Sequence, residues 1–549
     1  MAGRLPSDRK RLGRLQPSKP RRGFTSTVTV LSGVSTQTTR NGLMSKPRGR
    51  PADGRETDMY DDLAFNAAPE AAASLQRAEH PTEIRRRGQA KLQSEGRSSD
   101  SGAVWRRRLI ALVIVSLAIP WVFPIGSARM SVYRLTLCVT IFPSVFLWVM
   151  GRAGKMRIAD FAVILFACWR AASFLVVDGS IAFQAIGISF VETLGPYFLA
   201  RSCVRSADDF RAMATTLFVV IAVMLPFAFL EATTGQRVIL NVFGTLLPTY
   251  HDFGMEFRAG LARVQGPFDH SILFGAFCSS GFALTFLVVG FRNRFIARYA
   301  KAGIVAFTAA LSLSAGPVLG IAIQCLLIAW KRLADAIGTK FLSIVTITAY
   351  LVVQGIFWVV SNRSLIEFLL GRLTFDPMSY WSRRLIFDYA WLSVANHPLF
   401  GTALGRWDRP VWMPASIDNF WLAFAVMNGI PSALLLALAV LFCIVSIGWK
   451  SGLDEKQEEC RTAYIIVVLN WCLVGMTVYY WDAAYVLFLL LLGSGLWIRD
   501  SMPDAALAPG AANLPRSRLQ KTLAMPVHAE IGSGRRNNRV RRLEKSWLE

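Results

Sequence analysis

The chain has 549 residues, of which 53% are hydrophobic, and its formal net charge is +24 from 60 Lys and Arg against 36 Asp and Glu. The Lys and Arg residues cluster at the two ends of the chain and between apolar runs, which is typical of membrane flanks in contact with anionic lipid and argues against a nucleic acid partner. The sequence has no Walker-type loop, no CxxC and no His/Cys cluster, so it predicts no metal, nucleotide or other cofactor.

Both ends of the chain are predicted to be tails. Residues 1–105 are rich in Arg, Ser, Gly, Pro and Ala and have few long apolar stretches. Such a segment cannot bury enough surface to offset the entropy of ordering it, so we expect a disordered basic tail. Residues 501–549 are expected to form a second basic tail.

Between the tails, residues 106–500 are a succession of apolar runs of roughly 17–25 residues, the length that a helix needs to cross a bilayer. The expected fold class is an all-α polytopic membrane protein with about 12 transmembrane helices. The predicted spans are 109–125, 132–150, 158–177, 181–200, 214–230, 271–291, 302–314, 317–330, 341–360, 420–447, 463–480 and 483–498.

The distribution of Lys and Arg supports this topology, because short cytoplasmic connections carry an excess of basic residues. With these spans, the basic connections near residues 106–108, 152–157, 201–211, 292–301, 331–340, 450–461 and 499 all fall on one side. Both termini are therefore expected in the cytoplasm.

Two connections on the other side are much longer, at residues 231–270 and 362–418. Loops of this length usually carry function or are disordered, and their many aromatic, Pro and Gly residues favour order. The second loop also contains several Arg residues, against the general trend. An anionic ligand would explain that charge.

The first loop ends in Arg263-Val-Gln-Gly266-Pro-Phe-Asp269-His270. A functional interpretation has Arg263 binding a phosphate or sugar and His270 poised at the membrane surface, next to a tight turn at Gly266. The alternative is a re-entry turn with an interfacial Arg and His.

The second loop contains Tyr380-Trp-Ser-Arg383-Arg384 and Asp388, which we interpret as a short helix. Arg384 and Asp388 are four residues apart, so they are placed to pair on its surface. Alternatively, the arginines hold a diphosphate, whose geometry suits a guanidinium.

The same loop continues with His397-Pro-Leu-Phe-Gly401 and ends with Asp418-Asn419 at the start of a span. A Gly/Pro loop followed by an Asp-Asn helix cap accounts for both segments. Asp418 is also placed to act as a general base for a sugar hydroxyl.

Charged residues also lie in or at the ends of predicted spans, where they are costly and mark functional sites or buried pairs. Arg170 and Glu192, on neighbouring spans, are expected to pair, and Glu231 ends another span. The segment Ser312-Leu-Ser314-Ala-Gly-Pro317 divides one apolar stretch into two short helices with an external apex.

In order and placement, these motifs resemble the O-antigen ligase and polymerase-like superfamily, membrane glycosyltransferases that use polyprenyl-diphosphate-linked glycans. The resemblance covers residues 109–499 and includes a large external loop before the tenth helix. It rests on Arg263-x-x-Gly266-x-Phe268-x-His270, Ser312-x-Ser314, His397-Pro398-Leu399-x-Gly401 and Asp418-Asn419-x-x-Leu422 ahead of Gly429.

The resemblance implies a bacterial inner membrane enzyme that joins undecaprenyl-diphosphate-linked glycan repeat units to a glycan acceptor at the periplasmic face, without metal or nucleotide. It implies that arginines and Asn419 bind the diphosphate or glycan, and that an acidic residue and histidines serve as base or orient the acceptor. The binding candidates are Arg263, Arg383, Arg384 and Asn419, and the catalytic candidates are His270, His397 and Asp418.

The chain departs from this family in two places. Asp418 stands where ligases commonly have a His before the Asn, and Ala315-Gly316 replaces an Arg that often follows the Ser of the apex. Both departures favour polymerisation of an exopolysaccharide or O-antigen repeat over ligation.

Two other functions stay open. Charged residues inside spans and a broken helix are also typical of transporters, although the two halves of the chain show no inverted repeat. A non-catalytic partner of a polysaccharide export complex would use the long tails to dock on other assembly proteins.

Overall fold

The computed structural model describes residues 102–126, 128–250, 254, 256–258, 260–337, 377–405 and 407–501, and of residues 128, 337 and 377–383 it describes the backbone alone. The predicted span 341–360, residues 362–376 and nearly all of both predicted tails lie outside the described residues.

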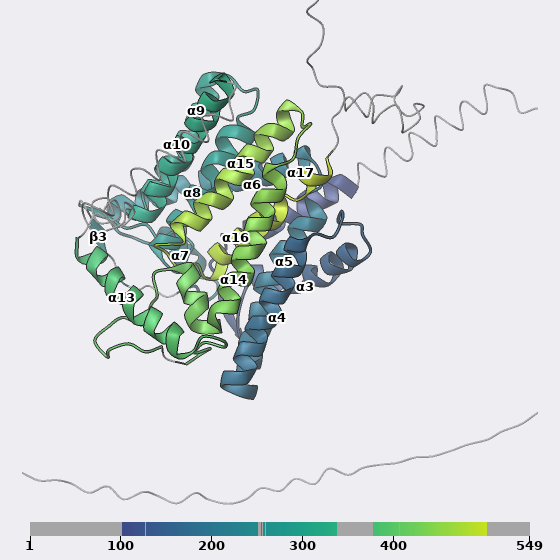
Figure 1. Ribbon diagram of the computed structural model, residues 1–549. Helices are drawn as coiled ribbons and strands as arrows, with labels where there is room; N and C mark the ends of the chain where they lie inside the picture. The colour runs from purple at the N-terminus through teal and green to yellow at the C-terminus, as the bar shows by residue number, and fades with distance from the viewer. Residues whose placement is uncertain are drawn as a thin grey trace, which may run out of the picture. The chain divides into compact units, whose positions relative to one another are not determined.

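The described chain is mostly helical (Figure 1). It begins with a helix at residues 102–116 and ends with α17. The elements between and including these are β1 (Val122–Ile125), β2 (Ala128–Ser131), α3 (Val132–Val149), α4 (Ile158–Asp178), η1 (Gly179–Ala182), α5 (Phe183–Cys203), α6 (Ala207–Thr234), α7 (Val238–Gly244), β3 (Phe257–Arg258), β4 (Leu261–Ala262), α8 (Ser271–Ala283), η2 (Leu284–Val289), α9 (Phe295–Ala310), α10 (Ala315–Ile337), α13 (Pro377–Asn396), α14 (Phe420–Gly448), α15 (Glu455–Val474), α16 (Asp482–Ser494) and α17 (Trp497–Asp500).

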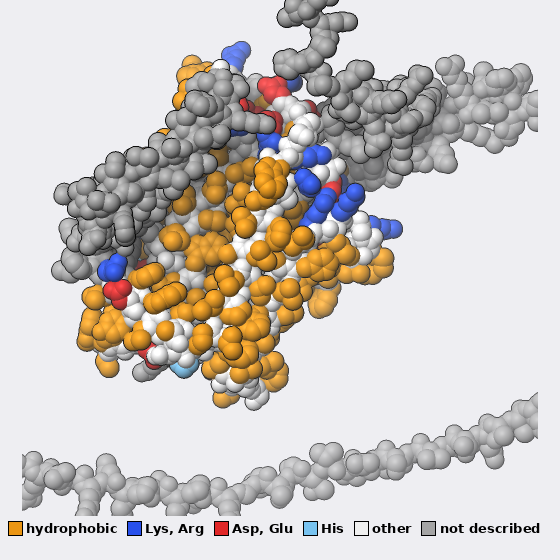
Figure 2. Space-filling model, in the orientation of Figure 1, with side chains coloured by type: hydrophobic (Ala, Val, Ile, Leu, Met, Phe, Trp, Pro, Cys, Tyr) orange, Lys and Arg blue, Asp and Glu red, His pale blue; other side chains and the backbone are white. Residues whose placement is uncertain are grey.

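The chain is a helical membrane protein. Within the described residues, 7 helical stretches are long and apolar enough to cross a bilayer, and one of them, Ile158–Cys203, includes both α4 and α5. Large apolar side chains cover the face of the bundle that Figure 2 shows. Val139 and Phe142 of α3 are 76% and 79% exposed. Such exposure is compatible with lipid rather than with water as the neighbour.

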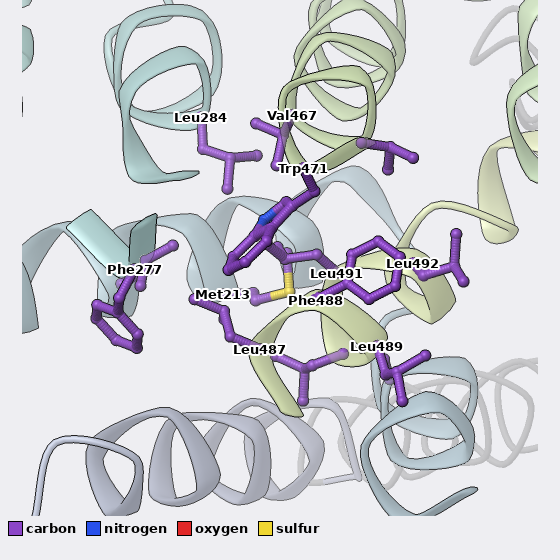
Figure 3. Close-up of a cluster of buried hydrophobic side chains, with 14 of the residues drawn as sticks. Met213, Phe277, Leu284, Val467, Trp471, Leu487, Phe488, Leu489, Leu491 and Leu492 are labelled. Carbon is purple, nitrogen blue, oxygen red and sulfur yellow. The ribbon is translucent and has the colours of Figure 1, made fainter. Parts of the chain in front are cut away.

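The core lies around α16, which is surrounded by α5, α8 and α15. Leu487 and Phe488 of α16 meet Trp471 of α15 in this core (Figure 3). The helices approach closely at Gly493, where a Cβ atom would lie 2.4 Å from the backbone oxygen of Tyr197. Because other helices surround α16, its side chains are buried on all sides, and an apolar sequence all around the helix suits this position.

The first predicted span, 109–125, is wrong over its second half. The helix ends at residue 116, and residues 122–125 form β1, which pairs with β2 in an antiparallel hairpin. Pro120 and Pro124 account for the difference, because proline lacks the N–H that a helix interior needs. Gly126, with a φ of 63°, forms the turn of the hairpin.

Other elements are also longer than predicted. Helix α9 begins at Phe295, before its predicted start at 302, and α15 begins at Glu455, in a charged segment. Asp454 caps α15 by accepting a hydrogen bond of 2.7 Å from the backbone N–H of Gln457. Helix α13 is 20 residues long, although we expected only a short helix in this loop.

The connections fall at two ends of the bundle. The basic face comprises residues 150–157, 203–206, 290–294, 449–454 and 499–501, and the loop face comprises residues 120–131, 179–182, 235–270, 311–314, 397–419 and 475–481. Ion pairs such as Lys456–Asp208 and Arg292–Glu455 join different helices at the basic face. The longer connections are at the loop face, as are the predicted site residues other than Arg383 and Arg384, which lie on α13.

Candidate functional site

The segment 263–270 forms a tight turn before α8, as predicted. Gly266 has a φ of 58°, a conformation that favours glycine. The carboxylate of Glu231, at the end of α6, accepts hydrogen bonds from the backbone N–H of Gln265 at 2.8 Å and of Gly266 at 3.2 Å. Glu231 therefore anchors the turn, which accounts for a buried carboxylate at the end of a span.

Arg263 joins this turn to the apex between α9 and α10. Its guanidinium donates to the hydroxyl of Ser314 at 2.9 Å and to the backbone oxygen of Ser312 at 3.4 Å, and it pairs with Glu256. The two motifs that the sequence presented separately thus form one structure. These protein groups occupy the donors of Arg263. In this conformation Arg263 therefore holds the turn 263–270 against the apex and does not bind a ligand.

His270 is the N-cap of α8. Its Nδ1 accepts a hydrogen bond of 3.1 Å from the backbone N–H of Ile272. Burial, and then the nearby charge of Arg263, lower the pKa of His270 below 6.5. The imidazole is therefore neutral at neutral pH, and with Nδ1 accepting, its proton is on Nε2, which is able to donate to a ligand.

Asp418 and Asp269 lie in the same neighbourhood. Both carboxylates interact electrostatically with His270 and oppose the lowering of its pKa. Asp269 accepts a hydrogen bond of 3.0 Å from the indole N–H of Trp481, whose ring centroid is 6.2 Å from that of His270. The structure therefore brings Arg263, His270 and Asp418 together from two loops far apart in the sequence.

Asn419 caps α14, as the sequence predicted. Its side-chain oxygen accepts a hydrogen bond of 3.0 Å from the backbone N–H of Leu422. The backbone N–H of Phe420, the residue after Asn419, donates to the backbone oxygen of Gly475 at 2.8 Å. These contacts fix the start of α14 directly after Asp418. Asn419 thus has a structural role in addition to its candidate role in binding.

The other candidates lie on α13 and directly after it. Arg384 and Asp388 form the predicted pair on the helix surface, at 3.4 Å and with both side chains about half exposed. The side chain of Arg383 lies outside the described residues. His397 is exposed at the end of α13.

The turn that begins at His397 packs into a break in α14. Gly429 has a φ of 80°, and a Cβ atom there would lie 1.9 Å from the backbone oxygen of Leu399. The N–H of Ile430 donates to the oxygen of Pro398 at 2.8 Å, and the N–H of Thr402 donates to Val426 at 2.9 Å. The turn satisfies backbone groups that the break exposes, which supports its Gly/Pro loop interpretation.

A cavity of about 520 Å³ opens at the loop face beside Asp269. It is lined by Val122, Phe123, Pro124, Arg129, Arg134, Pro248, Thr249, Tyr250, Asp269 and Asp482. Its charged groups are two guanidinium and two carboxylate groups, a combination able to hold a phosphate on one side and polarise a hydroxyl on the other.

Arg134 organises one wall of the cavity. It donates to Glu192 at 2.8 Å and to Asp482 at 2.7 Å, and Glu192 also accepts from the hydroxyl of Tyr133 at 2.9 Å. Asp482 has a φ of 50°, an uncommon conformation for a residue other than glycine. Such backbone strain is often found at functional sites.

The predicted pair of Arg170 and Glu192 is wrong. Helix α3 packs on α5 and brings Arg134 to Glu192, whereas Arg170 points to neutral groups, at 3.3 Å from the amide of Asn428 and 3.4 Å from the hydroxyl of Tyr485. Among the described residues, no carboxylate forms an ion pair with Arg170. Phe424, whose ring centroid is 5.0 Å from the guanidinium, adds a cation–π contact.

The sequence analysis missed Arg129, Arg134 and Asp482 as site residues. Arg134 and Asp482 lie within three residues of span ends, where a charge is ordinary, and only their convergence makes them notable. Within the described segments, no group of three His, Cys, Asp or Glu side chains is placed to hold a metal ion. Comparison with known proteins finds no matching family model and no matching curated protein.

Proposed function

We propose that the chain is a membrane glycosyltransferase that joins polyprenyl-diphosphate-linked glycan repeat units, in the synthesis of an exopolysaccharide or O-antigen. One observation carries the proposal: the turn 263–270, on which the family resemblance largely rests, borders a cavity of about 520 Å³ that contains both guanidinium and carboxylate groups. A diphosphate and a hydroxyl acceptor need these two kinds of group side by side.

In the proposed reaction, an acceptor hydroxyl attacks the anomeric carbon of the donor glycan. Asp269, a carboxylate of the cavity lining, takes the hydroxyl proton, a new bond joins carbon and oxygen, and the bond from the anomeric carbon to the diphosphate oxygen breaks. Polyprenyl diphosphate leaves with the bonding electrons, and Arg129 and Arg134 offset its negative charge. The Nε2 proton of His270 is placed to be donated to a donor or acceptor oxygen.

The proposal includes a topology of about 12 spans in a bacterial inner membrane. The loop face would be periplasmic and both termini cytoplasmic. The basic connections at residues 152–157, 201–211 and 450–461, all at the other face, support this orientation by the positive-inside rule.

The test is an elongation assay with purified protein and a polyprenyl-diphosphate repeat unit, without added nucleotide or metal. We expect longer lipid-linked glycans. Arg384→Ala decides whether α13 takes part: lost elongation with unchanged folding would place the diphosphate at the second loop, whereas full activity would leave it to the cavity arginines. An absence of product with intact donor and folded protein would reject the proposal.

A second candidate, transport, is favoured by the break in α14 at Gly429 and the nearby buried Arg170, because discontinuous helices with charged neighbours form binding sites in transporters. Proteoliposomes distinguish the two functions. Movement of the intact lipid-linked unit across the membrane without glycosidic bond formation would favour transport over transfer.

A further inference from the structure

A second cavity lies at the basic face, away from the candidate active site. Its volume is about 890 Å³, and it opens between the α3–α4 connection, the α14–α15 connection and the end of α17. Figure 2 shows Lys and Arg side chains gathered where these segments meet, next to the apolar surface of the bundle. The cavity is lined by Gly151, Gly154, Lys155, Met156, Arg157, Trp449, Lys450, Ser451, Arg499, Asp500 and Ser501.

The lining is strongly cationic. Lys155, Arg157, Lys450 and Arg499 face a single carboxylate, that of Asp500, so four positive charges meet one negative charge. Asp500 pairs with Arg157. In the described segments, Lys155, Lys450 and Arg499 form no ion pair, whereas other cations of the same face, such as Lys456, do. This excess of positive charge within one cavity favours an anionic ligand.

Arg157 also has an unsatisfied donor. Its Nε is buried and has no hydrogen-bond partner. A buried donor without an acceptor is costly, and native structures usually resolve the cost with a partner, a water molecule or a ligand. The Arg157 side chain as a whole is 27% exposed, so a change of its rotamer would turn this donor toward an oxyanion in the cavity.

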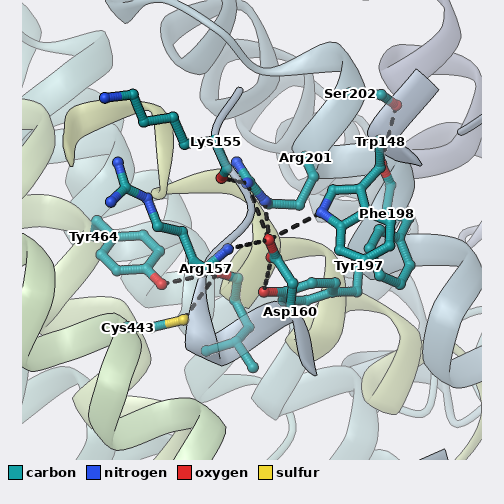
Figure 4. A network of polar contacts seen from close by, with 11 residues as sticks. Trp148, Lys155, Arg157, Asp160, Tyr197, Phe198, Arg201, Ser202, Cys443 and Tyr464 are labelled. Atoms are coloured by element: carbon teal, nitrogen blue, oxygen red, sulfur yellow. Dashed lines mark hydrogen bonds and ion pairs between the residues drawn. The ribbon is translucent and has the colours of Figure 1, made fainter. Parts of the chain in front are cut away.

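The floor of the cavity is rigid. The backbone N–H of Arg157 donates to Asp160 at 2.9 Å, and Asp160 also accepts from Tyr197 at 2.7 Å and from Arg201 at 3.0 Å (Figure 4). Arg201 reaches back to the backbone oxygen of Lys155 at 2.8 Å. The segment that carries two of the four cations is therefore held in place before any ligand arrives, which lowers the entropic cost of binding.

The rim of the cavity is apolar. Trp449 and Met156 both line it, and Trp449 is 82% exposed and Met156 is also exposed. Tryptophan is enriched at the depth of lipid headgroups, and basic pockets between helices bind anionic headgroups. A ligand with a phosphate at one end and acyl chains at the other satisfies both parts of this surface.

We propose that this cavity binds the phosphodiester headgroup of an anionic glycerophospholipid, with Lys155, Arg157, Lys450 and Arg499 around the phosphate and the acyl chains passing Trp449. The site is distinct from the proposed glycan site and does not depend on it.

The test uses full-length protein in phosphatidylcholine nanodiscs with a minor fraction of phosphatidylglycerol, and native mass spectrometry to measure the lipid that stays bound. The variant Lys450→Gln/Arg499→Gln removes two cavity cations. Its matched control, Arg292→Gln/Arg294→Gln, removes the same charge from exposed positions of the same face. We expect the cavity variant to retain phosphatidylglycerol about thirtyfold more weakly, and the control to match wild type.

A second arm distinguishes lipid from free phosphate. Wild-type protein in pure phosphatidylcholine nanodiscs is titrated with inorganic phosphate, followed by ³¹P NMR. We expect no saturable binding at concentrations at which phosphatidylglycerol is retained. Binding of inorganic phosphate as strong as that of the lipid would overturn the lipid assignment. Equal losses in both variants, or no phosphatidylglycerol retained by folded wild type, would overturn the site itself.

Discussion

Two buried networks of guanidinium and carboxylate groups, one toward each face, differ in what surrounds them. Arg201 and Asp160, toward the basic face, are 2% and 0% exposed, and Tyr197 and Trp148 complete their hydrogen bonds (Figure 4). Arg134, toward the loop face, is 13% exposed and divides its donors among Glu192, Asp482 and the backbone oxygen of Arg129 beside a cavity.

The comparison separates structural from functional charge. A closed network, with every group matched by protein, fixes the position of helices and has no capacity for a ligand. An open network of the same chemistry, whose own charged groups line a cavity as Arg134 and Asp482 do, is able to exchange a protein partner for a ligand group. Burial of charge alone does not mark a functional site, and access to the charge has to be considered as well.

The largest effect is expected at the closed network. Arg201→Leu should lower the free energy of unfolding by about 3–5 kcal/mol, because it leaves the carboxylate of Asp160 buried without its cation. Thermal unfolding in detergent measures the loss, with the surface variant Arg384→Leu as control. A loss no larger than that of the control would show that the pair is not a structural element.

Arg134→Leu should cost less, about 2 kcal/mol, because one of its carboxylate partners, Asp482, lines a cavity that water can enter. The same substitution should abolish glycan elongation in protein that is still folded. If it instead destabilises the protein as much as Arg201→Leu, the two networks have the same role and the distinction between them is wrong.

At His270, the effect should be smaller and depend on pH. His270→Ala should cost about 1 kcal/mol through loss of the α8 cap, whereas His270→Asn, which keeps an acceptor, should be nearly neutral. Both substitutions test the cap by thermal unfolding at pH 7.5.

The pH dependence follows from the lowered pKa of His270. The folded state binds the proton less readily than the unfolded state, so the contribution to stability is complete above the ordinary pKa of 6.5 and is lost as the pH falls through the folded value. The difference in unfolding free energy between wild type and His270→Asn should therefore shift against wild type from pH 7.5 to pH 5. A constant difference would contradict the neutral imidazole.

The smallest effect is expected at the surface of α13. Arg384 and Asp388 are about half exposed, so a double-mutant cycle with alanine should give a coupling energy of only about 0.3–0.5 kcal/mol, reduced further by salt. Coupling above 1 kcal/mol would mean that this pair is shielded from solvent and belongs with the buried networks.

Much of the local structure was predictable from the sequence. The apolar runs predicted a helical membrane protein, the Gly266 turn and the Asn419 cap follow from local backbone chemistry, and Arg384–Asp388 pairs at helical spacing. Local rules suffice where the interacting residues are close in the chain.

The cavity was not predictable in this way. Arg134 meets Asp482 across 348 residues, and Trp481 meets Asp269 across 212, so these contacts depend on how the helices pack. The sequence analysis assigned Glu192 to Arg170 because both lie within neighbouring spans, but packing of α3 on α5 offers a closer cation. Charge pairing in a bundle requires the packing order, which apolar runs alone do not specify.

The central claim is that the reaction takes place at the loop face, in the cavity beside His270. The most direct measurement compares two exposed arginines in the elongation assay: Arg129, which lines the cavity, and Arg292, at the basic face. We predict that Arg129→Gln lowers elongation about a hundredfold with unchanged stability, since it removes a donor to the leaving diphosphate, and that Arg292→Gln is fully active. Full activity of Arg129→Gln, or equal losses in both variants, would contradict the account.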